Sequence, residues 1–519
     1  MSKRFYVTTA IDYVNGEPHL GHGYEKVIAD VIARARRSLG EDVFFLTGSD
    51  EHGQKVQQAA IAKGKTPQAF CDELALVWKP FTEKLNLTIN DFVRTTEPRH
   101  TTAVQAIFQR LWDTGHCYKA TYEGFYSAKE ETFLTDKDRL PDGTFDPTYG
   151  EVLPLVEENY YFRLKEQQEW LIGHITANPE FIYPPQRRNE VLGFLKNNAL
   201  ADLCVTRPSA RLNWGIPLPF DPAYVAYVWF DALLNYITVP AAHGDAAVVS
   251  AIHGAPSAEA LELWPADVQV IGKDIVKFHA VYWPIMLKAL GLPLPKQLVV
   301  HGWWQKDGQR MSKSTGNVVD PLAVINEWGL DAFRYYVVRE LDIGADGNWT
   351  DSGFQARYHA ELANGLGNLV NRSLSMLRRY RDGRAPARAD DLAGAATEAA
   401  RSAIALIGEN RLQAALQAIW ALIDRANQYV EQTAPFKLAK DPAQASRLDE
   451  VLYNLVETCR VLAVLLWPFL PGTAARIFAQ LGLTTLPDRF AAAAWGGLTQ
   501  GHVIGAPEPL FPRRDAPAK

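Results

Sequence analysis

Cysteine is scarce in this sequence. The chain of 519 residues contains only four, Cys71, Cys117, Cys204 and Cys459. They are scattered and include no Cys-x-x-Cys pair, so they offer neither a disulfide framework nor a zinc knuckle. This pattern excludes a small disulfide-stapled domain and is typical of proteins in the reducing cytoplasm.

Long apolar runs are also missing. The longest, Val461 to Leu470, contains Pro468 and is much shorter than the roughly 20 residues that a membrane helix requires. The N-terminal residues lead directly into Phe5–Val7 without the apolar core of a signal peptide. We therefore expect a cytoplasmic protein with no membrane partner.

Positive charge is not in excess. The formal net charge is -6, whereas proteins that coat nucleic acid indiscriminately are strongly basic. Any RNA must therefore be bound by local basic patches. The hydrophobic and charged fractions, 47% and 22%, are ordinary, and the length predicts several domains that need no metal or disulfide for stability.

The first segment has the pattern of a βαβ unit. A β-rich run at 5–9 is followed by a helical pattern over about 21–39 and by a short apolar strand at 43–46. This order predicts a parallel sheet. The helix is expected to bury Val27, Val31 and Ala35 and to expose Arg34, Arg36 and Arg37.

The rest of the chain divides into three regions with different residue patterns. Aromatic residues, charges and turn signals interrupt the pattern from about 116 to 214, which indicates an insertion. Strands are expected again at 226–230, 268–271 and 298–302, and the chain after about 353 reads as a helical bundle. The predicted fold class is α/β: a Rossmann-type parallel-sheet domain with an inserted connective domain, followed by an α-helical bundle.

Two histidines flank a glycine in Pro18-His19-Leu20-Gly21-His22, between the first strand and the first helix. A helix N-terminus favours anions through its N–H groups and its dipole, and a glycine lets a ligand approach the backbone. Neutral imidazoles can donate hydrogen bonds to phosphate oxygens. The alternative is a pair of ordinary surface-loop histidines.

A second motif combines cations, hydroxyls and glycine in Arg310-Met311-Ser312-Lys313-Ser314-Thr315-Gly316-Asn317. Mobile cations in such a loop suit phosphoryl chemistry, which depends on positioning and charge neutralisation. The alternative is a solvated turn. The two motifs in this order are much more specific than either alone.

Together these motifs identify a resemblance. Residues 18–22 resemble the HIGH signature of class I aminoacyl-tRNA synthetases, and residues 310–314 resemble their KMSKS signature. The chain is most similar to the methionyl-tRNA synthetase family, over nearly its whole length. The resemblance is carried further by segments 8–16, 48–53, 228–236 and 271–279.

The resemblance implies a methionine–tRNA ligase. The methionine carboxylate attacks the α-phosphate of ATP in line, and Mg²⁺ and cations balance the leaving pyrophosphate. The 3′-terminal ribose of tRNA(Met) then attacks the methionyl-adenylate, so that the methionyl group passes to the tRNA and AMP leaves. No obligate protein partner is expected. The domains implied are 1–115 and 216–295 for the two halves of the catalytic domain, 116–215 for the connective domain, 296–352 for a stem-contact region with the KMSKS-like loop, and 353–519 for an anticodon-binding bundle.

The resemblance also implies a methionine pocket. Asp50 would pair with the α-ammonium group of the substrate, its alternative being a structural loop aspartate. The residues that match the pocket lining are Ile11, Tyr13, Trp229, Ala232, Tyr236, Ile275, His279 and Trp283. A flexible thioether packs well against aromatic edges, and the Tyr13 hydroxyl or a His279 nitrogen could contact the sulfur. The alternative for Trp229 and Trp283 is a place in the core.

For ATP, the resemblance implies catalytic roles for His19, His22, Lys313 and Arg310, where Arg310 stands in place of the usual first lysine. Gly21 and Lys273 would contribute to nucleotide binding, and Glu25 and Asp274 would contact the ribose. Arg207 is a weaker candidate for charge stabilisation.

In the helical region, Asn368 and Arg372 match the family's Asn-x-x-x-Arg anticodon pattern, and their spacing places them with Ser375 and Arg379 on one helix face. The family often has Pro-Trp farther along, where this chain has Pro435-Phe436. Phe436 could stack on an anticodon base, or could pack in the core against Leu438.

The clearest departure from the family concerns zinc. The stretches that match cysteine knuckles in relatives, 126–131 and 146–151, contain no cysteine. We therefore expect no structural zinc and a metal-free insertion. Because no appended domain follows the bundle, we also expect a monomer.

Three alternatives remain open. The chain could be another class I synthetase, although those for leucine and valine carry a larger editing insertion and that for cysteine uses zinc. It could be a small nucleotidyltransferase, although those chains are short and lack the bundle. It could also be a non-catalytic RNA-binding protein built on a synthetase scaffold.

Overall fold

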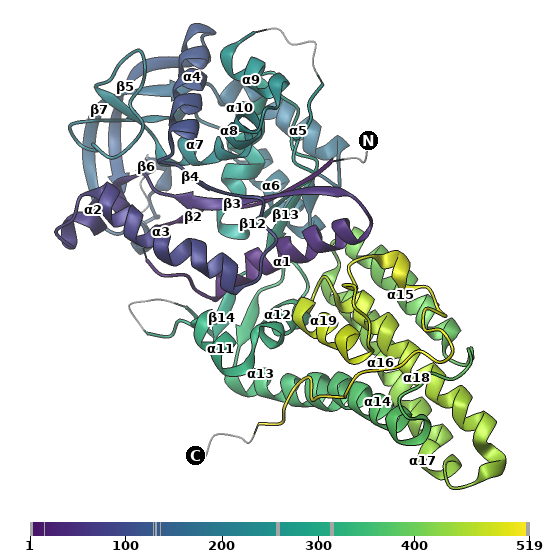
Figure 1. Ribbon diagram of the computed structural model, residues 1–519. Helices are drawn as coiled ribbons and strands as arrows, with labels where there is room; N and C mark the ends of the chain where they lie inside the picture. The colour runs from purple at the N-terminus through teal and green to yellow at the C-terminus, as the bar shows by residue number, and fades with distance from the viewer. Residues whose placement is uncertain are drawn as a thin grey trace.

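The computed structural model describes residues 4–14, 16–127, 129, 132–134, 136–255, 260–311 and 316–514. Figure 1 shows a part built around a sheet and an elongated helical part that extends away from it. The α/β class and the C-terminal bundle are thus confirmed.

The central sheet is parallel, as predicted. Its strands follow the order β2-β3-β1-β12-β13-β8, and β4 pairs with β3. The predicted strands at 5–9, 43–46, 268–271 and 298–302 are all present, the second of them longer than expected. The strands are β1 (Arg4–Thr9), β2 (Asp12–Tyr13), β3 (Asp42–Asp50), β4 (Asp91–Arg94), β8 (Ile182–Tyr183), β12 (Val268–Gly272) and β13 (Leu298–His301).

Helix α1 (Leu20–Ser38) follows the first strands, and here one prediction was wrong. Arg34 is buried rather than solvated, and its guanidinium forms an ion pair with Asp30 at 2.8 Å. Helix α1 packs on the sheet and also on α12 (Leu330–Arg339), so both of its faces are covered. A helical period alone cannot reveal a second packing partner.

The expected strand at 226–230 was also wrong. Only β11 (Tyr224–Ala226) is extended, and α7 (Val228–Leu233) begins two residues later. A short aromatic and apolar run suits a buried helix as well as a buried strand, because every residue in it is shielded. This helix carries Trp229 and Ala232 to the site described below.

Helices cover both sides of the sheet and connect its strands (Figure 1). They are α2 (Gln54–Ala62), α3 (Pro67–Lys84), α4 (Pro98–Asp113), α5 (Gln168–Ala177), α6 (Pro185–Asn197), α8 (Asn235–Ala242), α9 (Ala246–His253) and α10 (Trp283–Ala289), with the shorter turns η3 (Lys165–Gln167), η4 (Lys273–Ile275) and η5 (Phe278–Tyr282). Helix α9 lies within the Ala- and Gly-rich stretch 241–265.

The insertion forms its own antiparallel sheet in the order β6-β5-β7-β9. Its elements are β5 (Cys117–Ser127), β6 (Thr132–Leu134), η1 (Asp136–Asp138), η2 (Pro147–Tyr149), β7 (Val152–Phe162) and β9 (Leu203–Cys204), and β10 (Thr206–Pro208) pairs with β11. Strand β8 belongs to the stretch 116–215 but pairs with β13 of the central sheet. All four cysteines are free thiols and buried.

The chain then crosses to the helical part through a small sheet and two helices. These elements are β14 (Trp304–Lys306), β15 (Gln309–Arg310), α11 (Pro321–Trp328), α12 and β16 (Gly347–Trp349). The helical part consists of α13 (Asp351–Arg357), η7 (Tyr358–Gly367), α14 (Asn368–Arg381), α15 (Ala393–Gly408), α16 (Leu412–Thr433), α17 (Pro435–Leu438), η8 (Pro442–Gln444), α18 (Ala445–Leu466), α19 (Pro471–Gln480) and η9 (Phe490–Ala493). No helix in the described part of the chain is long and apolar enough to cross a membrane.

Candidate active site

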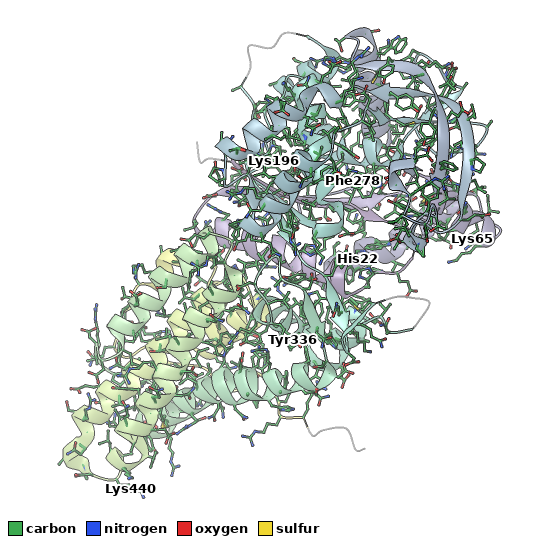
Figure 2. The ribbon with its side chains drawn as sticks, turned by 180° about the vertical axis from the view of Figure 1, so that it is seen from behind. His22, Lys65, Lys196, Phe278, Tyr336 and Lys440 are labelled. Carbon is green, nitrogen blue, oxygen red and sulfur yellow. The ribbon has the colours of Figure 1, made fainter. Side chains whose placement is uncertain are left out.

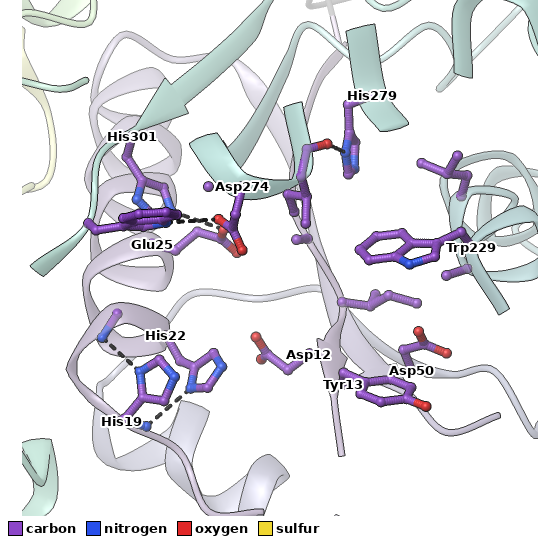
Figure 3. A pocket seen from close by; sticks show the side chains of 18 of the residues that line it. Asp12, Tyr13, His19, His22, Glu25, Asp50, Trp229, Asp274, His279 and His301 are labelled. Carbon is purple, nitrogen blue, oxygen red and sulfur yellow. Dashed lines mark hydrogen bonds and ion pairs between the residues drawn. The ribbon is translucent and has the colours of Figure 1, made fainter. Parts of the chain in front are cut away.

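A cavity of about 490 Å³ lies at the carboxyl ends of the central strands. Open α/β sheets bind ligands at this edge, because the chain leaves the sheet there in loops that can point side chains at a ligand. Asp50 ends β3, and Asp274 and His301 lie at the ends of β12 and β13. Figure 3 shows side chains from all these elements converging on one space.

His19 and His22 form the N-terminal cap of α1. The Gly21 main-chain N–H donates to Nδ1 of His19, and the His19 N–H donates to Nδ1 of His22, each at 3.1 Å. Because Nδ1 accepts in both rings, the neutral imidazoles carry their proton on Nε2. The rings stack with centroids 3.7 Å apart, and a Cβ at Gly21 would lie only 3.1 Å from the His19 ring. The expected strand–turn–helix context of this motif is therefore present.

Glu25 lies one turn farther along α1 and also faces the cavity. Its Oε2 accepts from Nε2 of His301 at 3.1 Å, and its Oε1 accepts from Nζ of Lys26 at 3.1 Å. Burial opposes ionisation here, but the Lys26 ammonium and the His301 hydrogen bond outweigh it, so the pKa of Glu25 is lowered. Asp274 is nearby (Figure 3), and its Oδ1 accepts from the Trp303 indole N–H at 3.2 Å.

Asp50 lies at the other end of the cavity, beside Tyr13 and Trp229 (Figure 3). The residues that follow it are anchored by buried bonds. Glu51 accepts two hydrogen bonds from Arg94, at 2.6 and 3.0 Å, and His52 Nδ1 lies 2.7 Å from Oδ2 of Asp231. These contacts fix the end of strand β3 and with it the position of the Asp50 carboxylate.

Aromatic side chains form the wall at the Asp50 end. Trp229 lines the cavity and stacks on Phe278, with centroids 3.8 Å apart and ring planes 10° apart. The Tyr236 hydroxyl donates to Nε2 of His279 at 2.9 Å, while His279 Nδ1 donates to the Ile275 carbonyl at 3.0 Å. Burial lowers the pKa of His279 to about 4, so its ring is neutral at pH 7. Ile11 and Ala232 complete this apolar wall.

Three residues singled out from the sequence lie outside the cavity lining. Trp283 is fully buried and packs against Tyr236 and Trp264, which is the core position weighed as its alternative. The Lys273 ammonium pairs with Asp346 at 2.6 Å. Arg207 is buried against the rings of Tyr126, Phe133 and Tyr227.

The second motif borders the same cavity. Met311 and Val318 line it, and they stand on either side of the segment 312–315. Lys313 and the side chain of Arg310 lie outside the described residues. Their assignment to ATP therefore stays a prediction, but the chain on both sides of Lys313 reaches the cavity.

Sequence reasoning missed several groups around the cavity. Asp12, Lys55, His301 and Trp303 line it, and Lys26 stands behind its wall. His301 lies at the carboxyl end of a predicted strand, and a polar side chain at that position is a usable signal. Lys26 gave no signal, because a lysine on a helix is normally solvated.

The candidate anticodon residues lie in the helical part, away from the sheet. Asn368 begins α14 and is exposed, and Arg372 pairs with Glu431 of α16 at 3.0 Å. Phe436 lies in α17, which Figure 1 shows at the end of the bundle. It is 42% exposed, which contradicts the alternative of a core position. In the view from behind, Lys440 marks this end, and His22 lies close to the sheet (Figure 2).

No group of three or more His, Cys, Asp or Glu side chains in the described ranges is arranged to hold a metal ion. Part of the stretch that matches cysteine knuckles, Ala128 and Glu130–Glu131, lies outside those ranges. The expected absence of zinc therefore stays a prediction.

Two family models match the chain. The model described as tRNA synthetases class I (M) matches residues 5–144 and 149–374, and the model described as the anticodon binding domain of methionyl tRNA ligase matches residues 389–516. Together they match nearly all of the sequence, in the order that the resemblance predicted.

Individual proteins are similar over the whole chain. The Methionine–tRNA ligase of Rhizobium meliloti is 41% identical over 99% of this chain and 98% of its own length, and that of Clostridium acetobutylicum is 41% identical over 100% of this chain and 79% of its own. Among solved structures, the Mycobacterium tuberculosis methionyl-tRNA synthetase in complex with methionyl-adenylate superposes with a TM-score of 0.90, at 38% identity, over 98% of this chain and all of that one.

Proposed function

Since the chain belongs to the methionyl-tRNA synthetase family, we propose that its cavity binds L-methionine at the Asp50 end and ATP at the His19 end. The protein is a methionine–tRNA ligase: it forms methionyl-adenylate and pyrophosphate, and transfers methionine to the 3′-terminal ribose of tRNA(Met). The observation that carries the proposal is that one cavity has a carboxylate and aromatic rings at one end and a capped helix N-terminus at the other.

At the methionine end, we assign each group by its chemistry. The Asp50 carboxylate pairs with the α-ammonium group, and a charge-assisted bond of this kind is strong when it is shielded from water. Trp229, Tyr236, Ile11 and Ala232 pack around the thioether side chain. Because His279 is neutral and its Nε2 accepts from Tyr236, this wall carries no charge that would oppose burial of the sulfur.

At the nucleotide end, His19 and His22 donate from Nε2 to the phosphates as negative charge shifts onto the leaving pyrophosphate. The N-terminus of α1 adds its dipole to the same place. The Glu25 and Asp274 carboxylates accept from ribose hydroxyls. Mg²⁺ arrives with ATP as part of the substrate, and Lys313 and Arg310 contribute mobile positive charge from their loop.

The order of events follows from the binding of both substrates in one cavity. Binding holds the methionine carboxylate against the α-phosphate, which turns a bimolecular attack into a local one. The carboxylate oxygen forms a bond to phosphorus, and the bond from phosphorus to the bridging oxygen of pyrophosphate breaks.

The helical part binds the anticodon through Asn368, Arg372 and Phe436, where an exposed ring can stack on a base.

The first experiment is methionine-dependent exchange of labelled pyrophosphate into ATP, with Mg²⁺ and without tRNA. Leucine, valine and cysteine serve as controls. Exchange with methionine alone supports the whole assignment. Exchange with another amino acid would keep the class I chemistry and refute the pocket assignment, and no exchange by folded protein that binds ATP would favour a non-catalytic RNA-binding role.

The loop assignment needs a separate variant. Lys313→Ala should abolish exchange while methionine binding, measured by equilibrium dialysis, is kept. Lys306→Ala, a nearby half-buried lysine of β14 outside the cavity lining, is the matched control. Equal loss of methionine binding in Lys313→Ala would show that the phosphate-binding loop lies elsewhere.

A further inference from the structure

Lys26 is a fully buried lysine that does not itself line the cavity. Its Nζ donates to the Ala10 carbonyl at 2.9 Å, to Asp12 Oδ1 at 3.1 Å and to Glu25 Oε1 at 3.1 Å. These three acceptors match the three N–H groups of an ammonium ion. A buried charge is tolerated only when it is paired and hydrogen-bonded in this way.

The two carboxylates that Lys26 holds both face the cavity. Asp12 comes from β2 and Glu25 from α1, and Figure 3 shows Asp12 between the histidine pair and the Asp50 end. Each is only 6% exposed. Lys26 therefore contacts, from behind the wall, two cavity-lining carboxyl groups that come from different elements.

The charges around the cavity indicate how this contact affects ATP binding. Four carboxyl groups line the cavity: Asp12, Glu25, Asp50 and Asp274. Burial raises the pKa of Asp12 to about 7, and the Lys26 ammonium opposes this rise and favours the ionised form. Among the described lining residues, Lys55 supplies the only ammonium or guanidinium group. The triphosphate of ATP is itself strongly anionic, so uncompensated carboxylates at this end would repel it.

Glu25 is also oriented by this arrangement. Lys26 holds Oε1 and His301 holds Oε2, so the carboxylate cannot rotate without losing one of two bonds. Each carboxylate oxygen keeps a further lone pair for a hydroxyl donor. Without Lys26, one oxygen of Glu25 and one of Asp12 would lose their buried cation.

We propose that Lys26 is a positioning residue for the nucleotide: it fixes the Glu25 carboxylate for hydrogen bonds with ribose hydroxyls, and it offsets the charge of Glu25 and Asp12 against the phosphates. This inference rests on the proposed function for the identity of the nucleotide. A purely structural lysine would affect ATP and methionine alike when it is replaced. A positioning lysine affects ATP alone.

The test measures ATP and methionine binding separately, by equilibrium dialysis of Mg·ATP and of L-methionine without turnover. Lys26→Met keeps the length of the side chain and removes its charge. We expect its Kd for ATP to rise about tenfold or more. We expect its Kd for methionine to change by less than about threefold. The exposed Lys288 of α10 gives the control variant, Lys288→Met, which should change neither constant.

A second substitution tests the charge directly. Lys26→Met with Asp12→Asn removes one of the two stranded carboxylates, so ATP binding should recover by about threefold or more relative to Lys26→Met. If Lys26→Met does not fold, the double variant is compared with Asp12→Asn alone, and the double variant should bind ATP more weakly because Glu25 has lost its cation.

Three results would overturn the proposal. The first is an unchanged Kd for ATP in folded Lys26→Met, and the second is an equal rise of the Kd values for ATP and methionine. The third is a double variant that binds ATP no more tightly than Lys26→Met or, if Lys26→Met does not fold, no more weakly than Asp12→Asn. Failure of the proposed function is recognised independently. In that case the wild-type protein would show no methionine-dependent exchange of pyrophosphate into ATP. The comparison of ATP binding between wild type and Lys26→Met would still test the role of Lys26.

Discussion

Asp30 of α1 and Arg334 of α12 form an ion pair of 2.7 Å between side chains that are both completely shielded from solvent. Arg334 also donates to the carbonyls of Pro468 and Phe469, in the turn between α18 and α19. The helix that begins with the histidine pair is thus joined through one guanidinium to the helical part of the protein.

Replacing Asp30 should destabilise the protein strongly. Asp30→Asn strands the buried Arg334 charge, and we expect the free energy of unfolding to fall by about 3–5 kcal/mol. Urea denaturation measures this loss, with the exposed Asp42→Asn as the control. A loss below about 1 kcal/mol would show that the pair contributes no more than a surface ion pair.

The same pair has a defined pH dependence. Burial raises the pKa of Asp30, but Arg334 and Arg34 outweigh it, so the folded-state pKa lies below its ordinary value. A lowered carboxyl pKa stabilises the fold above the unfolded pKa of about 4 and loses that effect as the pH falls through the folded value. The difference in unfolding free energy between wild type and Asp30→Asn should therefore shrink in acid, and a constant difference would contradict this origin.

Trp229 should determine methionine affinity. Trp229→Ala removes a ring that lines the cavity, and we expect the KM for methionine to rise about tenfold or more with the KM for ATP nearly unchanged. Pyrophosphate exchange measures both constants. The control is Trp112→Ala, which removes an indole that is 37% exposed and stacks on Phe220 outside the cavity. Equal rises for ATP and methionine would place Trp229 in a general structural role.

His279 should make the fold sensitive to mild acid. Its pKa falls from 6.5 to about 4 on folding because burial disfavours the charged ring. Its contribution is complete above the unfolded pKa and is lost as the pH falls toward the folded one, by roughly 2–3 kcal/mol at about pH 4.5. His279→Gln should lack this part of the loss when unfolding is compared at about pH 7 and about pH 4.5. Identical losses in both proteins would mean that the ring is not buried as a neutral group.

The far end of the bundle should affect only the second reaction. Arg372→Ala and Phe436→Ala are expected to raise the KM for tRNA about tenfold, because each removes a contact that we propose to the anticodon bases, while pyrophosphate exchange stays at the wild-type rate. Arg401→Ala, an exposed arginine of α15 paired with Glu398, is the control. Unchanged tRNA kinetics in both variants would move the anticodon site to another face.

The sequence alone determined the order of the elements and the family. The strand, the His-x-Gly-His turn and the helix are adjacent in the chain. Their order therefore predicts that His19 and His22 lie at the N-terminus of α1, where the structure shows them as its cap. Four strands of the parallel sheet, β1, β3, β12 and β13, were readable for the same reason, because each contains a short apolar run. The shorter strands β2, β4 and β8 were not predicted. Asp50 and His279 could be named through the resemblance, since both belong to continuous motifs.

Only the tertiary structure decided which side chains meet. The resemblance assigned both Trp229 and Trp283 to the methionine pocket, but only Trp229 lines the cavity, whereas Trp283 is buried behind it. Arg34 was predicted to be solvated and Lys26 was not singled out, yet both are buried. Helix α12 covers α1 from the other side, and Asp12 supplies a carboxylate from β2 to Lys26. The burial of a charge depends on partners that are distant in the chain, and the spacing of residues along one helix carries no record of them.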